Sequence, residues 1–138
     1  QTDASQNQKT EKMSPQRIRN IVLPLCAVLL AASCSMQPTP ASLSGCWTQP
    51  IPGQPQQVQG MALMPDGRAG SINMHTLLYT GWKLDGNRLI LTGKSIGNGS
   101  SSLFTATSTI DSLSRTRLIL NTDGNREAYT RTPHCAEQ

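Results

Sequence analysis

The chain has 138 residues, of which 36% are hydrophobic and 4% aromatic, so it has material for one small domain with a thin core. This argues against a large enzyme with a deep cleft. The formal charge is +4, but residues 1–33 hold four of the 12 basic and two of the 8 acidic side chains. The remainder is too evenly charged for the basic stripe that nucleic-acid binding requires, and we expect no nucleic-acid partner.

The first 33 residues have the composition of a targeting segment rather than of a folded domain. Residues 1–12 are polar and precede Met13, and we interpret them as an extension upstream of the natural start. Residues 13–33 have the pattern of an export signal, with Arg17 and Arg19 before a mostly apolar run over residues 21–32. That run is too short to remain in a membrane as a spanning helix.

The signal ends in small side chains before a cysteine, Leu30-Ala31-Ala32-Ser33-Cys34, and this resembles the lipobox of bacterial lipoproteins. The pattern prefers Leu where Ala31 stands. The resemblance implies that Cys34 receives a diacylglycerol, that the signal is cut before it, and that the new amino terminus is acylated, for example with palmitate. An ordinary secretory signal followed by an unmodified cysteine is the alternative.

The residues after Cys34 set the expected location. Ser35 stands where an Asp would retain an enterobacterial lipoprotein in the inner membrane, so by analogy we expect an outer-membrane protein facing the periplasm. Residues 34–42 are expected to form an extended, flexible tether.

Short apolar runs separated by turn residues follow, and no run shows a helical period. Asp-Gly pairs at 66–67, 85–86 and 123–124 are typical of tight hairpins, and further breaks are expected at 95–102 and 111–114. The expected strands are 43–48, 58–64, 68–73, 76–84, 88–93, 103–110, 115–120 and 125–132. They predict an all-β fold, an eight-stranded antiparallel up-and-down barrel that removes both sheet edges by closing on itself.

Two short motifs carry a family resemblance. Gly45-Cys46-Trp47 resembles the Gly-x-Trp opening of lipocalins, and the last strand ends in Tyr129-Thr130-Arg131, where those folds place a basic residue. With the segments 47–53, 71–74 and 93–99, the chain resembles the bacterial lipocalin-like domain over residues 43–132, leaving 133–138 as a tail. The resemblance implies a lipocalin-like barrel whose base is closed by Arg131 packed on the Trp47 ring.

Cys46 and Cys135 remain once Cys34 and the signal's Cys26 are set aside. Because an exported protein meets oxidising conditions and barrel closure brings the first strand beside the last, we expect a disulfide between them, with Cys46 pointing outward. Two free thiols are the alternative. A zinc site that adds His134 matches no metal motif, so we expect neither metal nor cofactor.

The residues predicted to bind a ligand are Met74, Tyr79, Trp82 and Phe104. Together with Met61 they are the large side chains most able to line a cavity. A filled barrel would use the same side chains simply as core. This packed-core interpretation is favoured, so the rim formed by segments 51–57 and 95–102 is the better place to look for a binding surface.

No nucleophile, base and orienting group occur together, so we expect no enzyme. The favoured function is a lipid-anchored module that binds a small apolar or amphipathic envelope molecule. The alternative is interaction with an envelope protein, as a periplasmic inhibitor or accessory subunit.

Overall fold

The computed structural model describes residues 35–135. The upstream extension, the expected export signal, Cys34 and residues 136–138 lie outside the described residues. Within residues 35–135, no helix is long and apolar enough to cross a membrane.

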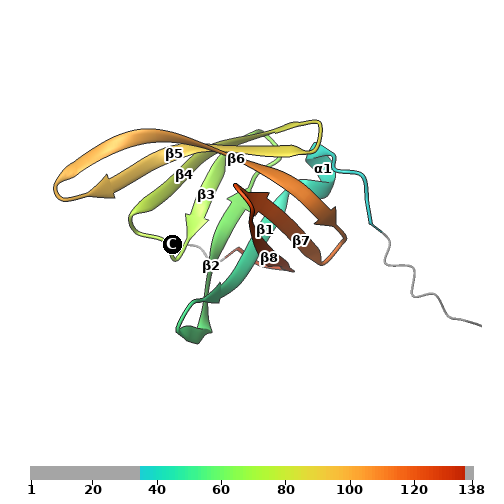
Figure 1. Ribbon diagram of the computed structural model, residues 1–138, viewed down its shortest axis with the longest axis horizontal. Coiled ribbons are helices and arrows are strands. Elements are labelled where there is room, and N and C mark those ends of the chain that lie inside the picture. Colours follow the sequence, from blue (N-terminus) through green and yellow to red (C-terminus); the bar gives the residue numbers. More distant parts are fainter. Residues whose placement is uncertain (1–34, 136–138) are drawn as a thin grey trace, which may run out of the picture. The chain divides into compact units, whose positions relative to one another are not determined.

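Eight antiparallel strands follow one short helix (Figure 1). The elements are α1 (Pro40–Leu43), β1 (Gly45–Ile51), β2 (Gln54–Leu63), β3 (Ala69–Ile72), β4 (Leu77–Asp85), β5 (Arg88–Gly97), β6 (Ser100–Leu113), β7 (Arg117–Thr122) and β8 (Asn125–Thr132). Their order in the sheet is β3-β2-β1-β8-β7-β6-β5-β4, so the first and last strands of the chain are neighbours. The predicted eight-stranded barrel is confirmed.

The barrel is nearly closed, and its seam lies between β3 and β4. One isolated bridge, Arg68 with Gly81, joins the two sides of the seam by backbone. The Ser71 hydroxyl adds two bonds, donating to the Leu77 carbonyl at 2.6 Å and accepting from the Tyr79 amide at 2.8 Å. A side chain on β3 therefore replaces part of the missing ladder.

Two predicted breaks are too long. Residues 95–97 belong to β5 and residues 100–102 to β6, and only a tight turn at Asn98 (φ 52°) and Gly99 (φ 76°) separates them. An Asn-Gly pair supplies the two positive φ values of a hairpin turn, so the flanking serines remain in strands. The resulting β5–β6 hairpin extends beyond the rest of the barrel (Figure 1). Residues 111–113 likewise belong to β6, which carries a bulge between Ile110 and Ser112.

The predicted tether also differs where the structure describes it. Thr39 caps α1, because its hydroxyl accepts from the Ser42 amide while the Ser42 hydroxyl accepts from the Thr39 amide. Leu43, expected in a strand, ends this helix with its side chain fully buried. The Met36 amide donates to the Leu113 carbonyl at 2.7 Å, so residues 36–43 lie against the barrel instead of extending from it.

Alternate residues of the strands point inward and fill one end of the barrel. The fully buried large side chains are Leu43, Trp47, Met61, Leu63, Leu89, Leu113 and Leu118. We call this end, which α1 covers, the closed end. The opposite end is the mouth, and it includes Gln49 of β1 and Glu127 of β8.

Candidate functional site

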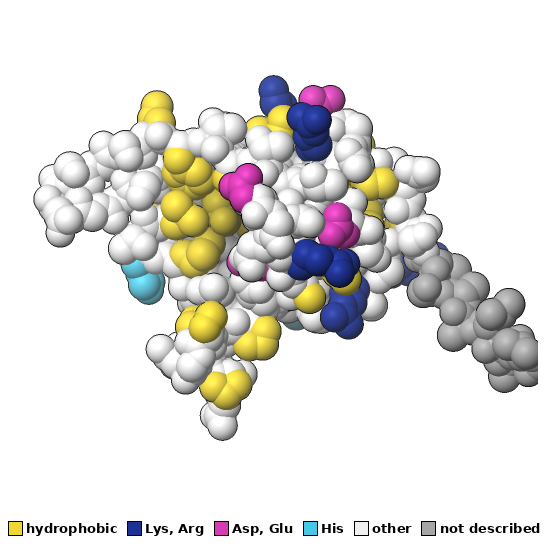
Figure 2. Space-filling view, in the orientation of Figure 1, with side chains coloured by type: hydrophobic (Ala, Val, Ile, Leu, Met, Phe, Trp, Pro, Cys, Tyr) yellow, Lys and Arg dark blue, Asp and Glu magenta, His cyan; other side chains and the backbone are white. Residues whose placement is uncertain are grey.

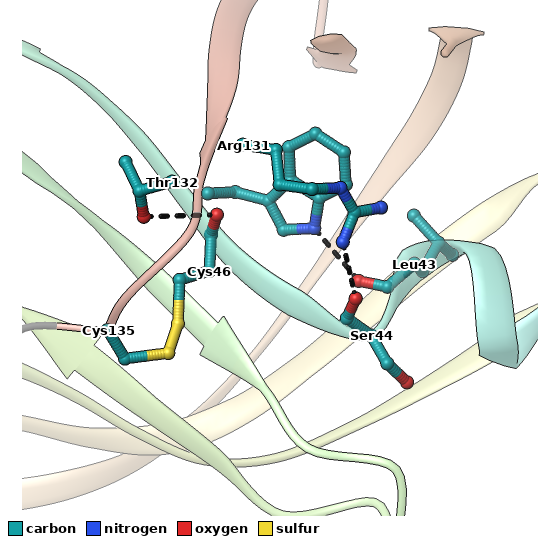
Figure 3. Close-up of a disulfide and its surroundings, with 7 residues drawn as sticks. Leu43, Ser44, Cys46, Arg131, Thr132 and Cys135 are labelled. Carbon is teal, nitrogen blue, oxygen red and sulfur yellow. Dashed lines mark hydrogen bonds between the residues drawn. A yellow bond between two sulfur atoms is a disulfide. The ribbon is translucent and has the colours of Figure 1, made fainter. Parts of the chain in front are cut away.

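The closed end is held by Arg131 of β8. Its guanidinium carbon lies 4.2 Å from the centre of the Trp47 ring, the contact that the family resemblance implied. Its three nitrogens donate to the backbone carbonyls of Ser42 and Ser44, each at 2.6 Å, and of Arg115 at 2.7 Å. Figure 3 shows the bond to Ser44. One side chain thus ties α1, the β6–β7 turn and β8 together, and the desolvation this entails lowers the pKa of Arg131.

The Gly-x-Trp motif has a structural role at the same place. Gly45 has φ 132°, and a Cβ there would collide with the Arg131 guanidinium. The Trp47 indole nitrogen donates to the Leu43 carbonyl at 2.8 Å. The motif therefore closes the barrel and leaves no room there for a ligand.

The expected Cys46–Cys135 disulfide is formed, with 5.4 Å between the two Cα atoms (Figure 3). Cys46 points outward and is buried with Ala62 and Ile72 in a small cluster separate from the main core. Within residues 35–135 no group of three or more His, Cys, Asp or Glu side chains is placed to hold a metal ion.

The mouth contains a cavity of about 200 Å³. Its lining residues are Gln49, Gln59, Gly60, Met61, Met74, Leu77, Tyr79, Glu127 and Tyr129. Hydrophobic side chains gather beneath the β5–β6 hairpin in Figure 2, with an acidic side chain beside them. The barrel is therefore core at one end and hollow at the other.

Two of the four residues predicted to bind a ligand, Met74 and Tyr79, line this cavity. Trp82 does not: it is 8% exposed within the core, and its indole nitrogen donates to the Met64 carbonyl at 2.8 Å. Phe104 is also outside the lining and packs against the Tyr79 ring with 6.0 Å between ring centres. It supports one cavity wall from the foot of the β5–β6 hairpin.

The polar residues of the cavity were missed by the sequence reasoning. The Tyr129 hydroxyl donates to the Glu127 carboxylate at 2.7 Å, and the Gln49 amide lies 3.5 Å from that hydroxyl. The alternation of inward-facing and outward-facing side chains along each strand could have identified these polar residues. Gln49 is two residues from Trp47, and Tyr129 and Glu127 are two and four residues from Arg131, so all share the inward face.

The cavity has a negative electrostatic character. Burial, reinforced by the hydrogen bond to Glu127, raises the pKa of Tyr129 well above its usual range. Burial, and then the charge of Glu127, raises the pKa of Tyr79. Both phenols therefore stay protonated near neutral pH. No Lys, Arg or His lines the cavity, and Glu127 is its one charged residue.

A larger hollow, of about 700 Å³, lies on the outside of the barrel beside the disulfide. Its lining residues are Ser44, Gly45, Ala62, Leu63, Met64, Pro65, Gly70, Ser71, Ile72 and Cys135. None of these is charged, and Cys135 is the last residue that the structure describes. We favour the mouth cavity as the candidate site because its polar groups converge on a space that is more enclosed than the outer hollow.

A family of lipocalin-like proteins matches residues 39–132. The chain belongs to the lipocalin-like family. Members of this family are typically binding proteins rather than enzymes. The chain is also similar to a crystal structure of a lipocalin-like protein from Bacteroides thetaiotaomicron VPI-5482. The two are 44% identical with a TM-score of 0.62, over 66% of this chain and 97% of the other. No curated protein matches the chain.

Proposed function

We propose that this lipocalin-like barrel binds a small apolar or amphipathic molecule of the cell envelope in the mouth cavity. The observation that carries the proposal is the cavity itself, where Met61, Met74 and Leu77 supply apolar walls and Glu127 and Tyr129 supply oriented polar groups. Small-molecule sites combine apolar walls with a few placed polar groups, and the large polar share of this lining favours an amphipathic ligand over a purely apolar one.

The size of the cavity limits the ligand. About 200 Å³ is less than the range of roughly 300–1,000 Å³ found for drug-sized ligands. It equals about seven water molecules at about 30 Å³ each. The ligand is therefore a single ring or short chain, or one end of a longer molecule whose remainder lies outside along the β5–β6 hairpin.

Methionine methyl groups provide the test, because four of them report on different places. Met61 and Met74 line the mouth cavity, Met64 lines the outer hollow, and Met36 lies near the closed end. In a titration with benzyl alcohol, followed by NMR of labelled methionine methyls, we expect the Met61 and Met74 signals to move. Movement of the Met64 signal alone would place binding in the outer hollow and contradict the proposal.

A pair of variants sharpens this test. Leu77 and Leu78 are both half-buried neighbours on β4, but of the two only Leu77 lines the cavity. Leu77→Trp should block the cavity and weaken benzyl alcohol binding about tenfold or more, whereas Leu78→Trp should not. Equal affinities of the two variants would contradict the proposed site.

We further propose that the protein is anchored through a lipid on Cys34 at the periplasmic face of the outer membrane. Support comes from the lipobox-like sequence before Cys34 and from Ser35 after it. Met36, two residues on, bonds the Leu113 carbonyl at the closed end. Two residues span at most about 7 Å, so an anchor on Cys34 would turn the closed end to the membrane and the mouth to the periplasm.

The anchor is tested by the intact mass of the protein extracted from membranes. A triacylated species beginning at Cys34 is expected, and Cys34→Ser should release the chain from the membrane fraction. An unlipidated native species would overturn both the anchor and the location.

One observation favours the alternative, a protein-interaction role. Residues 100–108 of β6 pair with β5 but not with β7. The pairing of β6 with β7 begins only at Thr109 of β6. This unpaired edge carries no charged residue, and Leu103 within it is 83% exposed. Such an edge can accept a strand from another protein. Crosslinking in envelope extracts from a photoreactive group at residue 103 would capture that partner, and the absence of any enriched partner would count against this role.

A further inference from the structure

We infer that the mouth cavity selects ligands whose buried end carries a protonated amine, which pairs with the Glu127 carboxylate. This inference rests on the proposed function, because it names the chemical class of the ligand for the same cavity. It runs against the simplest expectation for an apolar barrel, which is a neutral ligand or one with an acidic head group.

The charge of Glu127 is not balanced by an ion pair among the described residues. The ion pairs among residues 35–135 are Arg68 with Asp66 at 2.6 Å and Arg126 with Asp111 at 2.9 Å, and neither involves Glu127. A half-buried carboxylate without a cation is costly, because the groups around it replace water only in part. A ligand cation would compensate that charge, whereas a ligand carboxylate would be repelled by it.

Several hydrogen-bond acceptors lie around the Glu127 carboxylate. One Glu127 oxygen accepts from the Tyr129 hydroxyl at 2.7 Å, while the other has only the Asn125 amide at 3.5 Å. That second oxygen retains room for a strong donor. The Gln49 and Gln59 side chains, which also line the cavity, offer amide oxygens. A primary ammonium has three donors and no acceptor, so it matches this carboxylate and amide set.

The walls of the cavity are suited to a cation that carries an apolar body. The rings of Tyr79 and Tyr129 line the cavity, and aromatic faces attract cations. Met61, Met74 and Leu77 complete the wall and suit an apolar body attached to the cation. Burial, and then the charge of Glu127, raises the pKa of the Tyr79 phenol.

Three probes of one shape and different charge test the inference. Benzylammonium, benzyl alcohol and benzoate are titrated at neutral pH against the protein with labelled methionine methyls. We expect benzylammonium to bind about tenfold more tightly than benzyl alcohol and benzoate to bind least. Salt should weaken the binding of benzylammonium and leave that of benzyl alcohol nearly unchanged.

Two variants assign the preference to one carboxylate. Glu127→Gln keeps an acceptor for the Tyr129 hydroxyl but removes the charge, so the preference for benzylammonium should disappear while benzyl alcohol binds as before. Asp85→Asn removes the same charge at an exposed position by the β4–β5 turn, outside the cavity lining, and should keep the preference.

The possible failures are distinguishable. If benzyl alcohol moves the Met61 and Met74 signals and benzylammonium binds no better, the proposed function stands and this inference is overturned. A preference that survives Glu127→Gln also overturns it. If none of the three probes moves these signals at about a hundred times the protein concentration, the proposed function falls and the inference falls with it. Should Glu127→Gln fail to fold, the charge and salt series on the unaltered protein remains decisive.

Discussion

Replacing Arg131 by Met should be the most damaging single change at the closed end. Methionine keeps an apolar stem of similar length against the Trp47 ring but removes the charge and all three backbone bonds. Those bonds reach the carbonyls of Ser42, Ser44 and Arg115 at 2.6–2.7 Å, and each is charge-assisted. The substitution therefore removes at once the side-chain bonds that tie α1 and the β6–β7 turn to β8, and leaves the backbone bond from the residue 131 amide to the Thr116 carbonyl.

The expected loss follows from these contacts. A hydrogen bond to a charged group contributes about 1.5–3 kcal/mol, and the partial exposure of Arg131 reduces this to about 1 kcal/mol each, because water can solvate the freed carbonyls. The cation–π contact adds about 0.5–1 kcal/mol. Arg131→Met should then lower the free energy of unfolding by about 3–4 kcal/mol and the melting temperature by roughly 15 °C.

Urea unfolding followed by tryptophan fluorescence measures this loss directly, because Trp47 is fully buried. Arg117→Met is the matched control, since Arg117 is an exposed arginine on the neighbouring strand β7. Arg131→Lys keeps the charge over the ring and should recover about 1 kcal/mol. A loss below about 1 kcal/mol for Arg131→Met, or one equal to that of the control, would refute the assignment of barrel closure to this side chain.

Three further changes are expected to have measurable effects. Replacing both Cys46 and Cys135 by Ala should lower the free energy of unfolding by up to about 4–5 kcal/mol, because the disulfide closes a loop with a sequence separation of 89 residues; reduction of the unaltered protein should match this in urea unfolding. Gly60→Ala would drive a Cβ into the backbone of β1 and should cost about 2–3 kcal/mol, whereas Gly70→Ala on β3 meets open space and should be nearly neutral by the same assay. Because the folded state raises the pKa of Tyr129, its contribution to stability is complete below the ordinary tyrosine value of about 10 and is lost as the pH rises above it, so Tyr129→Phe should flatten the alkaline limb of a stability-against-pH curve.

The barrel could be predicted from the sequence because its turns are local signals. The Asp-Gly pairs fix the hairpins wherever they occur, and the positive φ of Asp123 (53°) and Gly124 (87°) is what such a pair supplies. The same logic applied to Asn98-Gly99 would have shortened the expected break at 95–102 to a two-residue turn, but the serines around it resemble a loop in composition. A two-residue turn signal therefore carries more information than the polarity of the residues around it.

The site was harder to predict because it depends on which strand ends meet in space. Trp82 and Phe104 are large and apolar, as cavity walls often are, but their positions along the strands place one in the core and the other behind Tyr79. Glu127 gives no signal from its neighbours in sequence. It becomes visible only once Arg131 is fixed as an inward-facing residue, because alternation along β8 then turns Glu127 inward as well.

The two ends of the barrel differ because the strands pair over different lengths. β1 pairs with β8 over only three residues, Cys46–Thr48 against Thr130–Thr132, all near the closed end. Beyond that point the two strands no longer pair through their backbones, and the cavity opens between Gln49 and Glu127. Closure by Arg131 and by the disulfide is concentrated where the strands still pair. Stability is therefore set mainly at one end, and this lets the protein tolerate the uncompensated carboxylate and the half-buried amides of the mouth.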